Sequence, residues 1–156
     1  DLQLKEGLQV IGYGAFNGCT SLENVTLPSS VIELRGGAFT GCSSLVDLQL
    51  KEGLQVIGEY AFRDCTALQN VTLPSSVIGL QGGTFARCSS LIELKVEEGL
   101  QVIESDAFNG CTALQNVTLP SSVIDIRGRA FAYCRSLVDL QLNCSSLVDL
   151  QLKEGL

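Results

Sequence analysis

Cysteine is the residue type with the most regular spacing in this sequence, and thiols can bind metal ions or form disulfides. Six of the seven cysteines follow one another at intervals of 23 residues: Cys19, Cys42, Cys65, Cys88, Cys111 and Cys134. A metal site is disfavoured, because the chain has no histidine and no Cys-x-x-Cys pair. The sequence therefore gives no reason to expect a metal or another cofactor.

The same cysteines could pair with one another or stay reduced. Units stacked ~4.8 Å apart would bring neighbouring cysteines within bridging distance. The side chains of such a row point the same way, however, so a bridge would need neighbouring sulfurs to turn toward each other. We favour a row of small buried thiols, which is the habit of free cysteine, with disulfides as the alternative. The out-of-phase Cys144 is the candidate for a free thiol or for pairing between chains.

Four asparagines open N-glycosylation sequons. Asn24, Asn70 and Asn116 each begin Asn-Val-Thr, and Asn143 begins Asn-Cys-Ser. The first three share one phase, which would place them on one outer face roughly 10 Å apart. In a secreted eukaryotic protein this arrangement predicts a row of glycans. In a bacterial protein, the asparagines and threonines would only be polar neighbours on a strand.

Carboxylates occupy the same phase in the alternate units: Asp1, Asp47, Glu93 and Asp139. Calcium requires six to eight oxygens at up to about 2.6 Å. Carboxylates roughly 10 Å apart cannot converge on one ion, so we expect a solvated acidic stripe. The glycine pairs at 36–37 and 82–83 match no phosphate-binding motif and are expected to form turns. With no histidine and no nucleophile–base pair, the chain is not expected to be an enzyme.

An internal repeat must position all of these residues. The six phenylalanines keep the 23-residue step of the cysteines, in phase as Phe-x-x-Cys: Phe16, Phe39, Phe62, Phe85, Phe108 and Phe131. Proline occurs only at 28, 74 and 120, so units of two kinds alternate and form a 46-residue double repeat. Such periodicity indicates about six stacked coils that bury a continuous core.

One unit contains the signals of short extended segments and a turn. Val25 and Leu27 alternate with an outward Thr26, which is the pattern of a half-buried strand. Pro28 ends that strand because it cannot donate to a ladder. Residues 31–34 predict a second short extended segment. Residues 38–45 have the spacing of a helix or a 3₁₀ helix, after the sharp turn that Gly36-Gly37 permits.

The repeat resembles the BspA-like leucine-rich repeats of bacterial and protist surface proteins. The matching residues are LPSSV at 27–31, 73–77 and 119–123, with AFTGCSSL at 38–45, AFRDCTAL at 61–68 and AFNGCTAL at 107–114. The resemblance covers residues 1–142 and implies a right-handed, β-rich α/β leucine-rich solenoid, cell-surface or secreted, often serving adhesion. The family supplies no conserved catalytic set. The alternate units depart from it, with LKEGL at 50–54 and VEEGL at 96–100 in place of LPSSV.

The charge and composition of the chain exclude some classes of binding partner. The net charge of −7, with only ten Lys and Arg, argues against nucleic acid and against anionic membrane surfaces. No stretch approaches the ~20 apolar residues of a membrane helix, and no targeting signal is visible. The absence of methionine predicts a mature fragment or an excerpt of a longer chain.

The rhythm breaks only near the end of the sequence. We divide the chain into a solenoid at 1–134 and an irregular tail at 135–156, in which SLVDLQL occurs at 136–142 and again at 146–152. The duplication predicts either an antiparallel hairpin or the start of a further coil. Neither end has a clear capping repeat, which predicts end-to-end self-association into a filament.

Two functions compete on this basis. The first is a non-enzymatic extracellular structural protein, part of a long solenoid or filament, with glycans on one face. The second is a cell-surface adhesion module that binds a host or matrix protein, which requires a face that varies between units. The outward strand positions vary little, with Lys95 as the main exception: Gln3, Thr26, Gln49, Thr72, Lys95, Thr118 and Gln141. This uniformity favours the scaffold.

Overall fold

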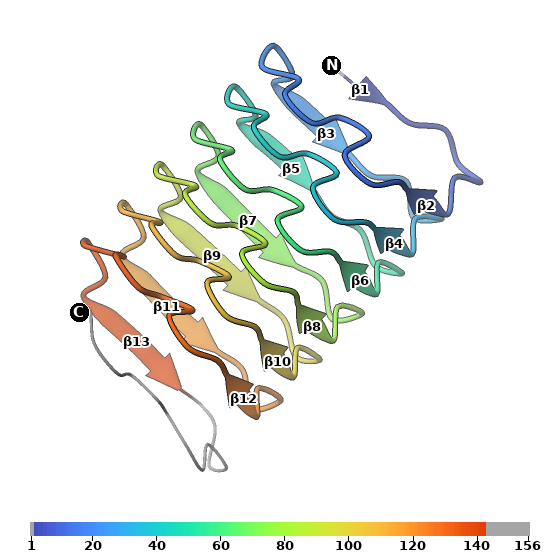
Figure 1. Ribbon diagram of the computed structural model, residues 1–156. Helices are drawn as coiled ribbons and strands as arrows, with labels where there is room; N and C mark the ends of the chain where they lie inside the picture. Colours follow the sequence, from blue (N-terminus) through green and yellow to red (C-terminus); the bar gives the residue numbers. More distant parts are fainter. Residues whose placement is uncertain (1, 143–156) are drawn as a thin grey trace.

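The structure, a computed structural model, describes residues 2–142, which form a parallel β-solenoid (Figure 1). The chain winds through about six turns of roughly 23 residues and then begins another. The register follows the repeat, since Val25 pairs with Leu48 and Val71 with Leu94. The solenoid that the sequence predicts is therefore confirmed.

Each turn contributes a strand to each of two faces. The first strands define what we call the strand face: β1 (Leu2–Gln3), β3 (Asn24–Thr26), β5 (Asp47–Gln49), β7 (Asn70–Leu73), β9 (Glu93–Val96), β11 (Asn116–Leu119) and β13 (Asp139–Leu142). The second strands have two residues each: β2 (Val10–Ile11), β4 (Glu33–Leu34), β6 (Val56–Ile57), β8 (Gly79–Leu80), β10 (Val102–Ile103) and β12 (Asp125–Ile126). The second strands form one parallel sheet, whereas the strand face divides into β1-β3-β5 and β7-β9-β11-β13.

Alternating burial explains where the strands form and end. In β3 the Val25 side chain is buried and Thr26 is exposed, and the following Leu27 is buried again. Pro28 has no N–H to donate to a ladder, and the strand ends before it.

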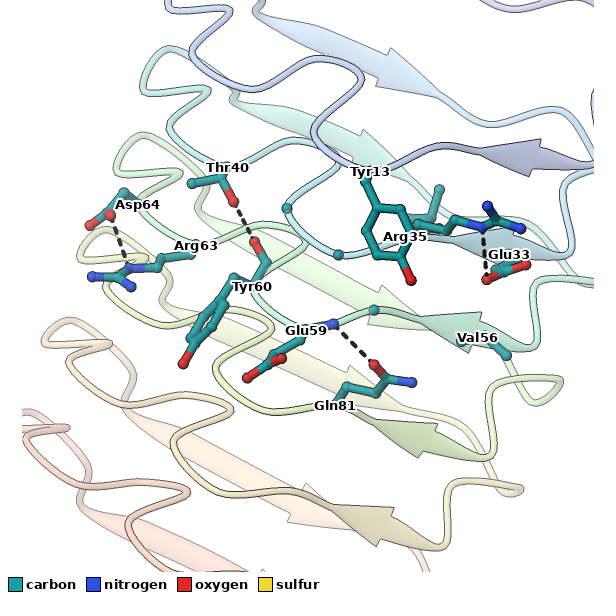
Figure 2. Close-up of a pocket in the computed structure, with 14 residues that line it drawn as sticks. Tyr13, Glu33, Arg35, Thr40, Val56, Glu59, Tyr60, Arg63, Asp64 and Gln81 are labelled. Atoms are coloured by element: carbon teal, nitrogen blue, oxygen red, sulfur yellow. Dashed lines mark hydrogen bonds and ion pairs between the residues drawn. The ribbon is translucent and has the colours of Figure 1, made fainter.

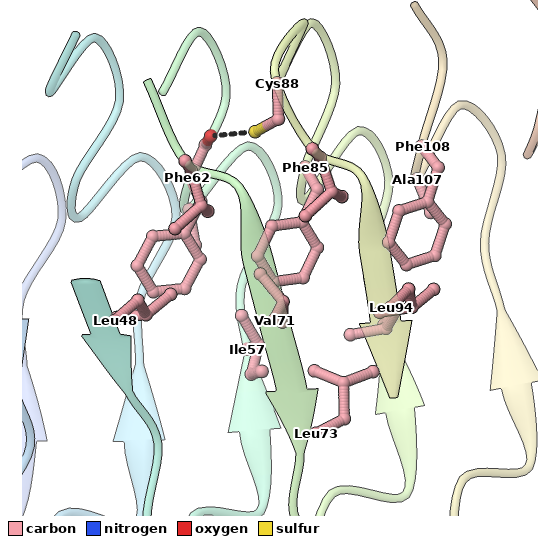
Figure 3. Packing of buried hydrophobic residues seen from close by; sticks show 14 of the residues in the cluster. Leu48, Ile57, Phe62, Val71, Leu73, Phe85, Cys88, Leu94, Ala107 and Phe108 are labelled. Atoms are coloured by element: carbon pink, nitrogen blue, oxygen red, sulfur yellow. Dashed lines mark hydrogen bonds between the residues drawn. The ribbon is translucent and has the colours of Figure 1, made fainter. Parts of the chain in front are cut away.

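The core consists of one row of phenylalanine rings with aliphatic rows beside it (Figure 3). Consecutive rings stack with centroids 5.0 to 5.6 Å apart and interplanar angles of at most 14°. Phe39, Phe62, Phe85 and Phe108 are completely buried, whereas Phe16 in the first turn is half-buried. Burying one such ring contributes roughly 1.5–3 kcal/mol. This burial requires stacked turns, because a single turn cannot cover its own apolar side chains.

The segment from Ala38 to Leu45 is a series of turns, so the predicted helical or 3₁₀ character is wrong. Some of its N–H groups bond within the turn, as from Thr40 to the Gly37 carbonyl. Others bond to the next turn of the solenoid, as from Phe39 to the Ala61 carbonyl. Because these donors are used between turns, a helical ladder cannot form. Among residues 2–142 there is no helix that is long and apolar enough to cross a membrane.

The 46-residue double repeat has a structural cause. Glu6, Glu52 and Glu98 in the odd turns each accept hydrogen bonds from the first serine of the following turn, Ser29, Ser75 and Ser121. The second serine completes the contact: Ser76 Oγ accepts from the Gly53 N–H and donates to the Leu54 carbonyl. We call this contact the Glu–Ser clasp. The LKEGL and LPSSV segments are thus two halves of one contact.

The described chain ends in a strand of the repeat. β13, residues 139–142, pairs in parallel with β11, with Asp139 opposite Asn116. The first SLVDLQL copy therefore lies where a further coil would begin. The second copy at 146–152, Asn143, Cys144 and the hairpin predicted from them lie outside the described residues, as does Asp1.

Candidate binding face on the loop side of the solenoid

The segments that follow the second strands carry most of the residue variation between turns. We call them the loop face: residues 12–20, 35–43, 58–66, 81–89, 104–112 and 127–135. All six arginines and all three tyrosines of the chain lie there: Arg35, Arg63, Arg87, Arg127, Arg129, Arg135, Tyr13, Tyr60 and Tyr133. The loop face is therefore chemically distinct from every other side of the solenoid.

The strand face is more uniform and carries an excess of acidic groups. Asparagines and carboxylates alternate along it, with Asn24 opposite Asp47 and Asn70 opposite Glu93. Neighbouring carboxylates of the row are thus two turns apart, and no group of three or more His, Cys, Asp or Glu in residues 2–142 is arranged to hold a metal ion.

The sequon residues lie on the strand face. Asn70 and Asn116 are exposed at the start of β7 and β11, and Asn24 is half-buried at the start of β3. The threonines two positions later are exposed in all three strands. The fourth sequon, at Asn143, lies outside the described residues.

The cysteine row lies inside, beside the phenylalanine rings. Cys42, Cys65, Cys88, Cys111 and Cys134 are buried free thiols, and Cys19 in the first turn is an exposed one. Each buried Sγ donates to a phenylalanine carbonyl 26 residues earlier, at 3.2 to 3.3 Å. Burial raises the pKa of Cys42 to about 11 and that of Cys65 to about 12. Thiols held neutral in this way are poor nucleophiles and poor metal ligands.

A hollow of about 540 Å³ opens on the loop face across the first four turns (Figure 2). Its side-chain lining comes from Tyr13 in the first turn, Arg35 in the second, Glu59, Tyr60 and Arg63 in the third, and Gln81 in the fourth. We call it the Tyr13–Tyr60 hollow.

Glycines of the following turn leave space for the two tyrosine rings. The Tyr13 ring lies against Gly36 of the next turn, where an added Cβ would be 3.4 Å from the ring. The Tyr60 ring lies against Gly83 so closely that no Cβ would fit there. The glycine pairs at 36–37 and 82–83 therefore do more than form turns, because they leave room for side chains from the preceding turn.

An arginine lies beside each tyrosine of the hollow: Arg35 of the next turn beside Tyr13, and Arg63 of the same segment beside Tyr60. The guanidinium carbon of Arg35 is 5.6 Å from the Tyr13 ring centroid, and that of Arg63 is 5.3 Å from the Tyr60 centroid. Both distances are within the range of a cation–π contact. Nonetheless Tyr13 remains 78% exposed and Tyr60 41% exposed. The rings are thus held in place while offering open surface.

The charges of the hollow are paired with one exception. Arg35 Nε lies 3.3 Å from Glu33, and Arg63 Nε lies 3.2 Å from Asp64. The exposed Glu59 carboxylate forms no ion pair with the described residues, although its backbone N–H donates to the Gln81 side chain at 3.1 Å. Glu59 is therefore a negative charge without a cation, next to Tyr60 (Figure 2).

The sequence interpretation considered only the outward strand positions and so missed the loop face. The signal was present, since tyrosine, arginine and glutamate replace glycine at particular phases of the repeat. Tyr13 and Glu59 share one phase with Gly36 and Gly82, and Tyr60 shares the next with Gly83. A face whose residues vary between turns, which the adhesion hypothesis requires, is therefore present in residues 2–142.

The fold and the repeat define a leucine-rich-repeat solenoid protein. The sequence profile of the BspA type leucine rich repeat region matches residues 1–92 and 80–153, in six copies. The chain therefore belongs to the BspA-type leucine-rich-repeat family, as the resemblance predicted. No curated protein sequence matches it significantly.

Solved structures of bacterial proteins share the fold. A leucine rich cell surface protein of Faecalibacterium prausnitzii is 34% identical, with a TM-score of 0.78 over 88% of this chain. The chain spans only 37% of that protein. A leucine rich repeat protein of T. pallidum is 35% identical, with a TM-score of 0.83 over 89% of this chain and 67% of its own. The pneumococcal vaccine antigen PcpA, at 22% identity and a TM-score of 0.68, covers 90% of this chain and 36% of its own length, and shares the fold alone.

Proposed function

We propose that this chain is a non-enzymatic binding module of a cell-surface or secreted protein, and that it contacts its partner through the loop face. The observation that carries the proposal is the gathering of every arginine and tyrosine on that face. Tyrosine and arginine are enriched in interfaces and dominate their binding energy. Because these residues differ from turn to turn, the loop face offers a unique patch that the uniform strand face lacks.

The family relationship supports the location. The F. prausnitzii relative is described as a cell surface protein. The proposed partner is another macromolecule, such as a host or matrix protein, and the proposed role is adhesion. This reverses the order of the two hypotheses drawn from the sequence. The scaffold hypothesis rests on near-identical repeats and a uniform strand face, whereas the varied loop face favours adhesion.

A pair of charge-matched variants tests the proposal. The loop-face variant replaces Arg87, Arg129 and Tyr133 by serine. The strand-side variant replaces Gln49 of the strand face, and Lys5 and Lys51 just after its strands, by serine. Beads coated with each protein are applied to arrays of extracellular-matrix and mucin proteins. We expect the loop-face variant to lose adhesion and the strand-side variant to retain it. Equal adhesion by both variants would exclude the loop face as the contact surface.

Two further properties predicted from the sequence are proposals of their own. Glycans on Asn24, Asn70 and Asn116 would project from the strand face and leave the loop face open. Mass spectrometry of tryptic peptides from native material tests their presence, and unmodified asparagines would remove this proposal. End-to-end association into filaments is tested separately, by averaging electron micrographs of the native material.

A further inference from the structure

We propose that the Tyr13–Tyr60 hollow binds a proline-rich peptide in the polyproline II conformation, which crosses the turns of the solenoid from Tyr13 to Tyr60. The inference rests on the proposed binding function and specifies the chemistry of a ligand for one part of the loop face. It is carried by three features of the hollow: the two-turn offset between its two tyrosines, their unpaired hydroxyl groups, and the single unpaired carboxylate.

The number of turns between the two tyrosines fits the peptide. Tyr13 belongs to the first turn and lies against the second, whereas Tyr60 belongs to the third and lies against the fourth. Two turns of strand spacing correspond to roughly 9.6 Å. A polyproline II helix repeats every three residues, and at 3.1 Å per residue its pitch is roughly 9.3 Å. Prolines at positions i and i+3 would therefore meet Tyr13 and Tyr60 in succession.

The tyrosines supply hydrogen-bond donors and exposed aromatic surface for such a peptide. Polyproline II has no internal hydrogen bonds, so its carbonyl oxygens are free to accept from a protein. Aromatic-lined grooves bind it because its conformation is already ordered before binding. The Tyr13 and Tyr60 hydroxyl groups donate to no other described residue, and both rings are exposed. The arginines beside them restrict the rings, which reduces the entropy lost on binding.

The unpaired Glu59 adds a preference for charge. Arg35 and Arg63 are neutralised by Glu33 and Asp64, so the hollow carries one net negative charge at Glu59. A lysine or arginine between the two prolines would reach this carboxylate in the third turn. The predicted ligand is therefore Pro-x-x-Pro with a basic residue at one of the x positions. A neutral oligosaccharide could also stack on two tyrosines, but it would leave Glu59 without a partner.

The experiment uses a fluorescent peptide of four Pro-Pro-Lys triplets, with binding followed by fluorescence anisotropy. Comparison peptides are four Pro-Pro-Glu triplets and four Ala-Ala-Lys triplets. We expect the first peptide to bind better than either of the others. Tyr13→Ala and Tyr60→Ala should each weaken it about fivefold or more, and Gln49→Ala, on the strand face, should leave it unchanged. Glu59→Gln should reduce the preference for Lys over Glu peptides more than Glu23→Gln, which removes the same charge away from the hollow.

The possible failures are distinguishable. Circular dichroism confirms that each variant is folded, and Tyr60→Phe provides a second variant that keeps the ring and removes only its hydroxyl. Absence of peptide binding by a protein that still adheres through its loop face would overturn this inference and leave the proposed function intact. Binding of a glycan array that depends on Tyr13 and Tyr60 would also overturn it, in favour of a sugar site. If the wild-type protein neither adheres through its loop face nor binds the peptide, both proposals are overturned.

Discussion

The carboxylate of Glu52 accepts hydrogen bonds from both the backbone N–H and the hydroxyl of Ser75, at 3.0 and 3.1 Å. The N–H of Ser76 donates to the same carboxylate at 3.2 Å. These two serines lie in the fourth turn and Glu52 in the third, so the clasp joins an odd turn to the even turn that follows it. The contact requires Glu-Gly in one turn and Ser-Ser in the next, which explains why these two pairs alternate in the sequence.

Glu52→Gln should destabilise the solenoid at neutral pH. The Ser75 N–H, with its hydroxyl and Ser76, lowers the pKa of the Glu52 carboxyl below its ordinary 4.5. A carboxyl with a lowered pKa in the folded state stabilises the fold above its unfolded pKa and loses that effect as pH falls through the folded value. The wild-type protein should therefore melt a few degrees higher than Glu52→Gln at pH 7, and the two should converge below pH 4.5.

Glu23→Gln is the matched control for this measurement. Glu23 is exposed, and its side chain forms no ion pair or hydrogen bond with the other described residues. The Glu23→Gln substitution removes the same charge as Glu52→Gln but no hydrogen bond. The melting temperature of this variant should therefore equal that of the wild type at both pH values. An equal loss in both variants would show that net charge, not the clasp, sets the stability.

Gly53→Ala should be strongly destabilising, whereas Gly79→Ala should not. Gly53 has a φ of 104°, and an added Cβ would lie 2.8 Å from the Ser29 carbonyl oxygen. Left-handed strain and a backbone clash together predict a loss of about 2–4 kcal/mol. At Gly79 the nearest atom to an added Cβ is 3.8 Å away, so alanine should be neutral or stabilise by about 0.4–1 kcal/mol. Urea unfolding of both variants checks this, and similar losses would contradict it.

The period of the repeat made the core predictable from sequence. Phe39 and Cys42 recur with every turn, and only stacked units can bury such a pattern. The side-chain direction in β3 followed from alternation and from Pro28. These features depend on residue type and spacing alone, which is why the sequence contains them.

Contacts between unlike turns could not be predicted in the same way. That Tyr60 lies against Gly83, or that Glu52 reaches Ser75, depends on the lateral placement of loops, which a repeat period does not specify. The error over Ala38–Leu45 has the same origin. Its i, i+3, i+4 spacing is also produced by successive turns whose N–H groups bond to the next coil.

The buried thiols should make the protein sensitive to alkali. Burial raises the pKa of Cys65 to about 12 and that of Cys134 to about 11, from an ordinary 9.0. A group whose pKa is raised by folding stabilises the fold fully below the unfolded pKa, and this contribution is lost as pH rises toward the folded value. The free energy of unfolding should therefore fall from pH 9 to about pH 11.

Thiolate absorbance measures this directly. The buried row should show little thiolate until the protein unfolds, because burial raises the pKa values of Cys42, Cys65 and Cys134. A thiol reagent should label Cys19 rapidly and Cys65 and Cys88 only in denaturant. Rapid labelling of Cys65 or Cys88 in the native state would contradict the buried row.

Arg87→Gly should stabilise the protein, although glycine usually weakens a fold. Arg87 has a φ of 61°, at the phase where Gly18, Gly41 and Gly110 supply left-handed residues in other turns. The left-handed conformation costs an ordinary residue roughly 1–2 kcal/mol. The additional unfolded-state entropy of glycine costs roughly 0.4–1 kcal/mol. Because the first effect is larger and Arg87 forms no ion pair with the other described residues, a net gain of up to about 1 kcal/mol is expected.

Arg87→Ala separates backbone strain from side-chain loss. Alanine removes the same guanidinium but keeps the strained conformation, so its stability should stay within about 0.5 kcal/mol of the wild type. Denaturant unfolding of the two variants gives the difference between them. If alanine stabilised as much as glycine, the gain would come from removing the arginine side chain. A gain confined to glycine would show that the left-handed positions of the loop face carry backbone strain wherever another residue replaces glycine.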